Sequence, residues 1–193
     1  MFLKKKQLKE YIFANNGTMD ITDPAYDKGT CCRMKVDVKP TTYRCVYYIG
    51  SHFSNDEISE YMNQYKNADE KSYIKENFKT IDEYLQSRLD DIQHRCFEIE
   101  IQEKGRAFPR DSKKWKLIGT IGVDSGMAGF FPDKPDFNDK EWNNFCDNIA
   151  LLKGPAYFKS NLGFWTNSGY GDGGYKVEAI KENNQIIALR ILF

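Results

Sequence analysis

Alternation of apolar and polar positions marks β-strands on both sides of a central helical stretch. Over residues 32–38 the even positions are Cys, Met, Val and Val, whereas the odd positions are Arg, Lys and Asp, which is typical of a half-buried strand. Residues 43–49 are rich in Tyr, Val and Ile, which suit a pleated surface. With residues 39–42 as the turn, we predict a hairpin over residues 32–49.

Strand patterns return after the helical stretch. Residues 97–101 alternate cleanly, and residues 115–123 carry the next strand. In the tail, residues 175–180 and 186–193 flank the polar residues 182–185, which predicts a hairpin. One face of its last strand is expected to carry four large apolar side chains, Ile187, Leu189, Ile191 and Phe193.

The helical stretch covers residues 54–94 and begins with the sequence of a capping box at residues 54–57. A second capping box is expected at Thr80 and Glu83. Behind it, helical spacing produces an apolar stripe of Ile81, Tyr84, Leu85, Leu89 and Ile92. A short helix is predicted from Asn138 onward, with its inward side chains at Trp142, Phe145 and Ile149.

Together these elements predict an α+β fold. We expect a mainly antiparallel, twisted β core, sandwich-like or partly closed, with helices packed on it. The length of 193 residues suits one domain, so we expect a single domain over 1–193 with a helical insertion at about 54–94.

Composition narrows the functional classes. The 28 basic and 28 acidic side chains cancel, which argues against nucleic acid as a partner. No run approaches the ~18 apolar residues of a membrane span, and lysines follow the first three residues where a secretory signal would be apolar. We therefore expect a cytoplasmic protein that does not bind membranes.

The five cysteines point to reduced thiols, because their number is odd and their density low. No spacing matches a structural zinc site, and we expect no cofactor. Cys32 and Cys45 are expected to face each other as buried thiols across the first hairpin. A cysteine–histidine nucleophile pair stays open, since such partners need not be close in sequence.

Three segments, each with an Asp and two of them also with Gly, lie at strand ends and carry the candidate chemistry. They are residues 22–26, 123–126 and 168–175. Tight turns at strand ends present functional side chains on a β scaffold, but each segment also suits a turn with no further role. The candidate site residues are Asp23, Tyr26, Asp124, Ser125, Asp172 and Tyr175.

Known catalytic patterns fit these segments poorly. Asp124-Ser125-Gly126 has the triplet of aspartic proteases, but a second matching triplet is absent. Ser125 also lacks the Gly-x-Ser-x-Gly elbow of serine hydrolases. If the strands that carry Asp23, Asp124 and Asp172 end at one edge, the three carboxylates would suit a divalent cation or acid–base chemistry.

As a set, these motifs resemble a bacterial family of uncharacterised cytosolic proteins. The resemblance is carried by Asp23-Pro24-x-Tyr26, the Cys31-Cys32 strand, Val123-Asp124-Ser125-Gly126, Ser168-Gly-x-Gly-Asp172-Gly-x-Tyr175 and a terminal hairpin ending in Ile-x-Phe. It spans most of the chain except residues 54–94. The resemblance implies membership of this family but no activity, because the family has none established. No catalytic residue therefore follows from it.

Two functions remain open at this point. The first is a non-enzymatic interaction or accessory protein of a bacterial cytosol, of the immunity type, with another protein as its partner. Its contact face would lie around the aromatic pairs Phe130-Phe131 and Phe164-Trp165. The alternative is a metal-binding or hydrolytic enzyme that uses Asp23, Asp124 and Asp172.

Overall fold

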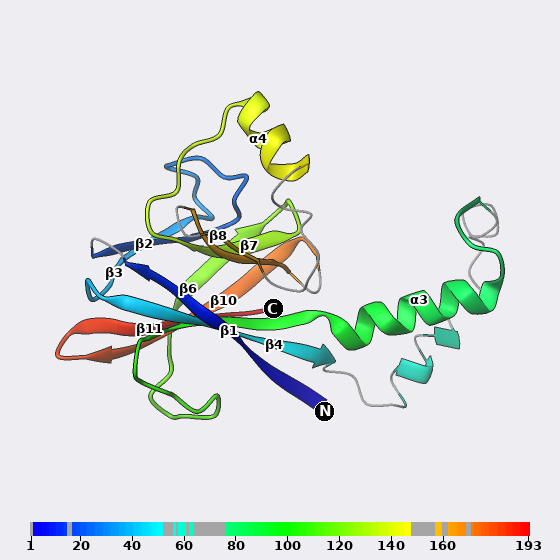
Figure 1. Cartoon of the computed structure of the whole chain (residues 1–193), viewed down its shortest axis with the longest axis horizontal. Coiled ribbons are helices and arrows are strands. Elements are labelled where there is room, and N and C mark those ends of the chain that lie inside the picture. Colours follow the sequence, from blue (N-terminus) through cyan, green and yellow to red (C-terminus); the bar gives the residue numbers. More distant parts are fainter. Residues whose placement is uncertain are drawn as a thin grey trace.

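Two antiparallel sheets form the body of the protein (Figure 1). The structure, a computed structural model, describes residues 2–14, 17–51, 56, 58–60, 62–63, 76–147, 157–159, 162–168 and 171–193. The first sheet has six strands in the order β1 (Phe2–Ala14), β4 (Thr42–Ser51), β5 (Cys96–Glu103), β11 (Gln185–Leu192), β10 (Gly173–Glu182) and β6 (Lys116–Val123). The second has five, in the order β3 (Met34–Asp37), β2 (Thr18–Thr22), β7 (Met127–Phe131), β9 (Gly163–Asn167) and β8 (Tyr157–Lys159).

The main core lies between the two sheets, so the predicted sandwich-like, mainly antiparallel β core is confirmed. From the second sheet, Met19, Ile21, Phe130 and Phe164 are all fully buried. Facing them, the first sheet contributes Cys45, Ile99, Ile101, Ile121, Val123, Val177, Leu189 and Ile191. Burial of side chains of this size stabilises a fold by about 1.5–3 kcal/mol each.

Helix α4 (Asp139–Phe145) covers the outer face of the second sheet, as Figure 1 shows. Its predicted start is confirmed, because Asn138 and Glu141 form a reciprocal capping box. Phe145 packs on Trp165, with their ring centroids 5.5 Å apart. Trp142 lies half-buried against the same cluster. Strands β7 and β9 are therefore covered on both faces.

Helix α3 (Ile81–His94) leads into β5 and extends away from the sheets (Figure 1). Thr80 caps its first turn by accepting a hydrogen bond from the Glu83 amide. The expected capping box is only half formed, because the Glu83 carboxylate accepts from the Lys79 amide. Tyr84 and Leu85 are buried, but the expected apolar stripe is wrong at Ile81, which is 45% exposed. The capping box expected at residues 54–57 lies largely outside the described residues. No helix of the described chain has the length and apolar character needed to cross a membrane.

The predicted hairpin over residues 32–49 is wrong, because its two strands belong to different sheets. β3 pairs with β2, whereas β4 pairs with β1 and β5. The turn at residues 39–42 is a crossing between sheets, fixed by a hydrogen bond of 2.9 Å from the Lys39 amide to the Ile186 carbonyl. Cys32 and Cys45 consequently do not face each other across a hairpin. Cys45 is buried in the core, and Cys32 lies in the loop before β3.

The C-terminal hairpin is confirmed. β10 and β11 pair through a two-residue turn at Asn183 and Asn184, whose φ values of 49° and 62° are those of a tight hairpin turn. The expected shared face is wrong at Ile187. A shift of register follows Ile180 in β10, so Ile187 packs with Ile180 on the outer side, whereas Leu189 lies in the main core.

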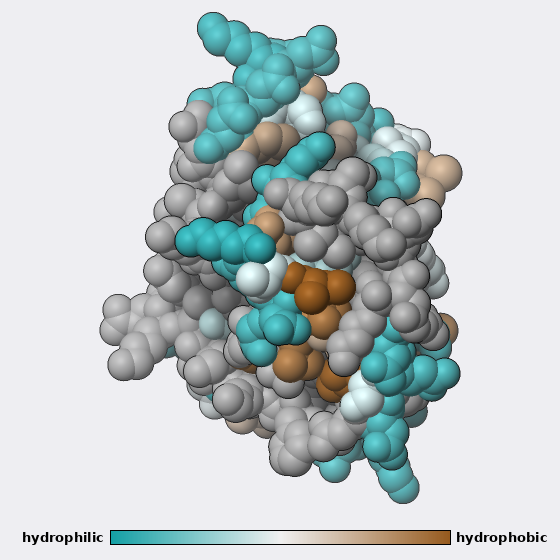
Figure 2. All heavy atoms as spheres, turned by 90° about the vertical axis from the view of Figure 1, so that its right-hand side faces the viewer, coloured by the Kyte–Doolittle hydropathy of each residue, from teal (hydrophilic) through white to brown (hydrophobic). Residues whose placement is uncertain are grey.

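The aromatic pairs predicted to form an exposed contact face are inside the protein. Phe130, Phe131, Phe164 and Trp165 are all 0% exposed. Figure 2 shows hydrophobic residues in the centre of one face, bordered by hydrophilic ones. Among the described large hydrophobic side chains, those that are strongly exposed are Ile81 and Leu117. An interaction role therefore needs a surface other than the aromatic pairs.

Candidate functional site

The three Asp-containing segments meet at one end of the sandwich. Asp23 follows β2 of the second sheet, and Asp124 follows β6 of the first. Gly173 lies opposite Val123 in the pairing of β10 with β6, which brings the third segment to the same end. The Ser168 amide also donates a hydrogen bond of 2.8 Å to the Gly126 carbonyl. The convergence considered from the sequence is thus present at the level of the backbone.

Asp23 joins the two sheets at this end. Its carboxylate is fully buried and accepts four hydrogen bonds. Oδ1 accepts from the Ala25 amide at 2.7 Å and from the Ser125 hydroxyl at 2.6 Å. Oδ2 accepts from the amides of Asp124 at 2.8 Å and Ser125 at 2.7 Å. All the donors to this carboxylate are neutral, and three of the four come from the loop between β6 and β7.

Tyr26 and Asp124 form a second contact beside this carboxylate. Tyr26 is half-buried, and burial together with a hydrogen bond to Asp124 raises the pKa of its phenol well above the ordinary range. Asp124 itself is exposed. A phenol held in its protonated form is a hydrogen-bond donor, so Tyr26 is suited to orient the Asp124 carboxylate.

Asp172 and Tyr175 have different surroundings. The Asp172 side chain is exposed and has no hydrogen bond or ion pair within the described residues. Tyr175 is buried, donates a hydrogen bond of 2.7 Å to the Gly171 carbonyl and packs edge-on against Phe193 at 5.1 Å. Gly171 has a φ of 83°, which favours glycine. Tyr175 therefore fixes the loop rather than presenting its hydroxyl.

The chemistry available at this end is limited. The acceptor positions of Asp23 are taken up by backbone and hydroxyl donors. Among the described residues, no group of three His, Cys, Asp or Glu side chains is placed to hold a metal ion. The geometry of Asp23 and Ser125 is that of a clamp between two sheets.

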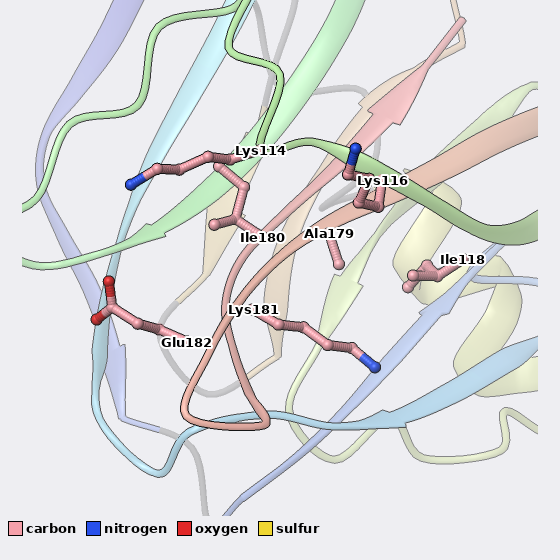
Figure 3. A pocket seen from close by; sticks show the side chains of 7 residues that line it. All are labelled: Lys114, Lys116, Ile118, Ala179, Ile180, Lys181 and Glu182. Carbon is pink, nitrogen blue, oxygen red and sulfur yellow. The ribbon is translucent and has the colours of Figure 1, made fainter.

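A second region, which sequence reasoning missed, lies along the edge strand β6. A depression of about 430 Å³ is lined by Lys114, Lys116, Ile118, Ala179, Ile180, Lys181 and Glu182. In Figure 3 the side chains of Lys114 and Lys181 lie at different ends of this group of residues, and Ala179 lies between them. Leu117, beside it on β6, is 59% exposed. We call the depression together with Leu117 and Thr120 the β6 edge site.

The β6 edge site carries net positive charge. Glu182 is bound by Arg106, whose Nη2 lies 2.7 Å from Oε1, and this contact holds the pKa of Glu182 below its usual range. In the described part of the chain, the ammonium groups of Lys114, Lys116 and Lys181 have no carboxylate within ion-pair distance. Three positive charges are therefore left available to a ligand.

A bulge explains why this site was missed. Alternation through Leu117, Gly119, Ile121 and Val123 places Leu117 on the buried face. In the pairing with β10, however, Val177 lies opposite Gly119, whereas Glu178 lies opposite Leu117, so Ile118 is an extra residue. Leu117 is consequently turned outward. Lys114 and Lys116, at the start of the strand, were the available signal of an exposed edge.

Comparison of the chain with models of known protein families, with curated proteins and with solved structures gives no match. The resemblance to a bacterial family of cytosolic proteins stays a prediction.

Proposed function

We propose that this protein is a non-enzymatic interaction protein that binds an extended acidic segment of another protein along β6. The observation that supports the proposal best is the exposed edge of β6 beside three lysines that form no ion pair with any described residue. The bound segment would add a strand to the first sheet, with main-chain hydrogen bonds for affinity and side-chain contacts for specificity.

The backbone of β6 offers hydrogen bonds to such a strand. The Gly122 amide points away from β10, because it donates to the Cys32 carbonyl at 3.1 Å. Thr120, two residues earlier in regular register, points its N–H and C=O to the same side. Within the described residues no backbone group pairs with them. Thr120 is thus an open pairing position, bounded on one side by the Cys32 segment.

The positive charge of the β6 edge site determines which kind of segment binds there. A second copy of β6 would bring its own lysines against Lys114 and Lys116, and like charges oppose edge-to-edge pairing. An acidic segment would place carboxylates near these ammonium groups. An apolar side chain of the segment would cover Leu117, and full burial of a leucine is worth about 1.5–3 kcal/mol.

The experiment uses a synthetic peptide with alternating Glu and Val, labelled with a fluorophore, and a matched peptide with Lys in place of Glu. Binding is followed by fluorescence anisotropy at low and moderate salt. We expect the acidic peptide to bind more tightly, and more weakly as salt is added, because exposed charges are screened over about 10 Å at 0.1 M. The Lys peptide is expected not to bind.

The test variant is Thr120→Pro, which removes an outward N–H without removing a bond to β10. We expect affinity to fall about tenfold or more, since a lost hydrogen bond and the ring's obstruction together cost about 1.4 kcal/mol or more. Thr120→Val keeps the N–H and serves as the matched control. Equal binding by the two variants, or equal binding of the two peptides, would contradict the proposal.

The enzymatic alternative gains no specific support at its three aspartates. Asp23 is enclosed by its donors, and the Asp172 side chain is exposed to solvent. The proposal therefore rests on the β6 edge site, and the Asp23 clamp is assigned a structural part in holding β6 against the second sheet.

A further inference from the structure

Two neighbouring thiols lie at the surface of the loop before β3. The Sγ atoms of Cys31 and Cys32 are 3.6 Å apart. Cys31 is exposed and Cys32 is half-buried, whereas Cys45 and Cys96 are buried in the core. Cys146 is half-buried at the end of α4. The chain therefore presents one pair of accessible thiols within reach of a single bound atom.

The loop that carries the pair is anchored on both sides. Arg33 follows it directly and forms an ion pair of 3.0 Å with Asp20, and both side chains are nearly buried. The Cys32 carbonyl accepts from the Gly122 amide of β6. Turn hydrogen bonds from Thr30 to Asp27 and from Arg33 to Thr30 fix the intervening backbone. Because the loop is held in place, a ligand that needs two sulfurs meets them already positioned.

The surroundings raise the pKa of Cys32 but leave its thiol accessible. The hydrogen bond with Cys31 is the main cause that raises the pKa of Cys32, followed by the charge of Cys31, burial and the charge of Asp124. A ligand that reacts with thiols and releases their protons as water removes this restraint. Soft centres prefer sulfur ligands over the carboxylates nearby.

We propose that Cys31 and Cys32 form a two-thiol binding site for a soft trivalent centre, of which a monosubstituted arsenical is the test case. In the reaction, an arsenical oxide R–As=O takes both thiols to form R–As(SCys)₂. Two S–H bonds and the As=O unit are replaced by two As–S bonds and one water. Arsenic stays trivalent, so no oxidant or reductant is needed. The site is independent of the peptide-binding function proposed above.

The experiment treats the folded, reduced protein with one equivalent of phenylarsine oxide, adds excess 2-mercaptoethanol and measures intact mass. A monothiol competes with a single-sulfur adduct but poorly with a chelate, because release of one sulfur leaves the other bound. We expect one phenylarsenic group to be retained per chain, and 2,3-dimercaptopropanol to remove it.

Three single variants locate the adduct. In Cys31→Ser and in Cys32→Ser we expect the retained adduct to fall about tenfold or more, because either change destroys the chelate. Cys146→Ser removes another half-buried thiol and is expected to behave like the unchanged protein. Circular dichroism and thermal melting establish that each variant is folded.

The proposal is overturned if the unchanged protein retains no adduct after the monothiol. It is also overturned if Cys31→Ser and Cys32→Ser retain as much as the unchanged protein. Should both serine variants melt early, the same comparison is made with Cys31→Ala, whose side chain is exposed and whose truncation leaves Cys32 in place. Retention by that variant equal to that of the unchanged protein has the same meaning.

Discussion

Replacing Asp23 by Asn tests whether a buried carboxylate clamps the two sheets together. The substitution keeps the size of the side chain but exchanges one acceptor oxygen for an NH₂ group. In one orientation this group faces the amides of Asp124 and Ser125, and in the other it faces the Ala25 amide and the Ser125 hydroxyl. Either way, at least one backbone donor is left opposite another donor.

The expected cost follows from these contacts. A buried donor that loses its partner costs about 1–3 kcal/mol, and the remaining hydrogen bonds lose their charged acceptor. We expect Asp23→Asn to lower the free energy of unfolding by about 2–4 kcal/mol, a large part of the stability of a typical domain. Ser125→Ala removes one donor and leaves three, so we expect about 1 kcal/mol.

Urea unfolding followed by tryptophan fluorescence measures both effects. Asp172→Asn is the matched control, because Asp172 is exposed, and we expect a change within about 0.5 kcal/mol. The slope of free energy against urea must stay the same for the comparison to hold. If Asp23→Asn is no more destabilising than Asp172→Asn, Asp23 is not a clamp and the account of this end is wrong.

Two further predictions concern the core. Phe164→Ala should lower the free energy of unfolding, measured by urea titration, by about 3–5 kcal/mol, because Phe164 is fully buried between the sheets. Leu117→Ala should change it by less than about 0.5 kcal/mol, because Leu117 is exposed. Burial raises the pKa of Cys96 to about 12 from an ordinary 9.0, so the folded thiol keeps its proton when the unfolded one has lost it. The contribution of Cys96 to the free energy of unfolding should therefore be fully present below pH 9 and should be lost as the pH rises toward 12, by at most about 1.4 kcal/mol per pH unit. Urea titrations at successive pH values measure this slope, and Cys96→Ala should reduce it.

Local signals predicted the parts of the fold that local contacts decide. Asn183 and Asn184 adopt positive φ between β10 and β11, which a polar Asn pair between two apolar strands indicates directly. The capping box at Asn138 and Glu141 is likewise closed within four residues. In both cases the atoms that stabilise the element are close in the sequence, so the pattern suffices.

Strand partners were harder to predict because they are chosen by distant residues. β3 and β4 are separated by a short polar link, which favours a hairpin when nothing else is known. Pairing of β3 with β2 and of β4 with β5 depends instead on residues up to 60 positions away. The aromatic residues of β7 were misread for a similar reason. A strand covered by a sheet on one face and by α4 on the other is apolar throughout, and it resembles an exposed aromatic patch until its second cover is known.

The candidate sites illustrate the same division. The Asp and Pro of residues 22–26 and the Asp and Gly of residues 123–126 indicated tight loops, but only the fold shows that the Asp23 carboxylate binds the amides of the other loop. The β6 edge site depends on the extra residue at Ile118, which alternation does not reveal. The clamp and the edge site also share strand β6. The Asp23 carboxylate binds the Asp124 amide at the end of this strand, and the Cys32 carbonyl accepts from the Gly122 amide. The open pairing positions therefore begin at Thr120. Because β6 is fixed at that end by the second sheet, the position of its exposed half is restrained, and we expect that loosening the clamp with Ser125→Ala would weaken peptide binding without touching the lysines.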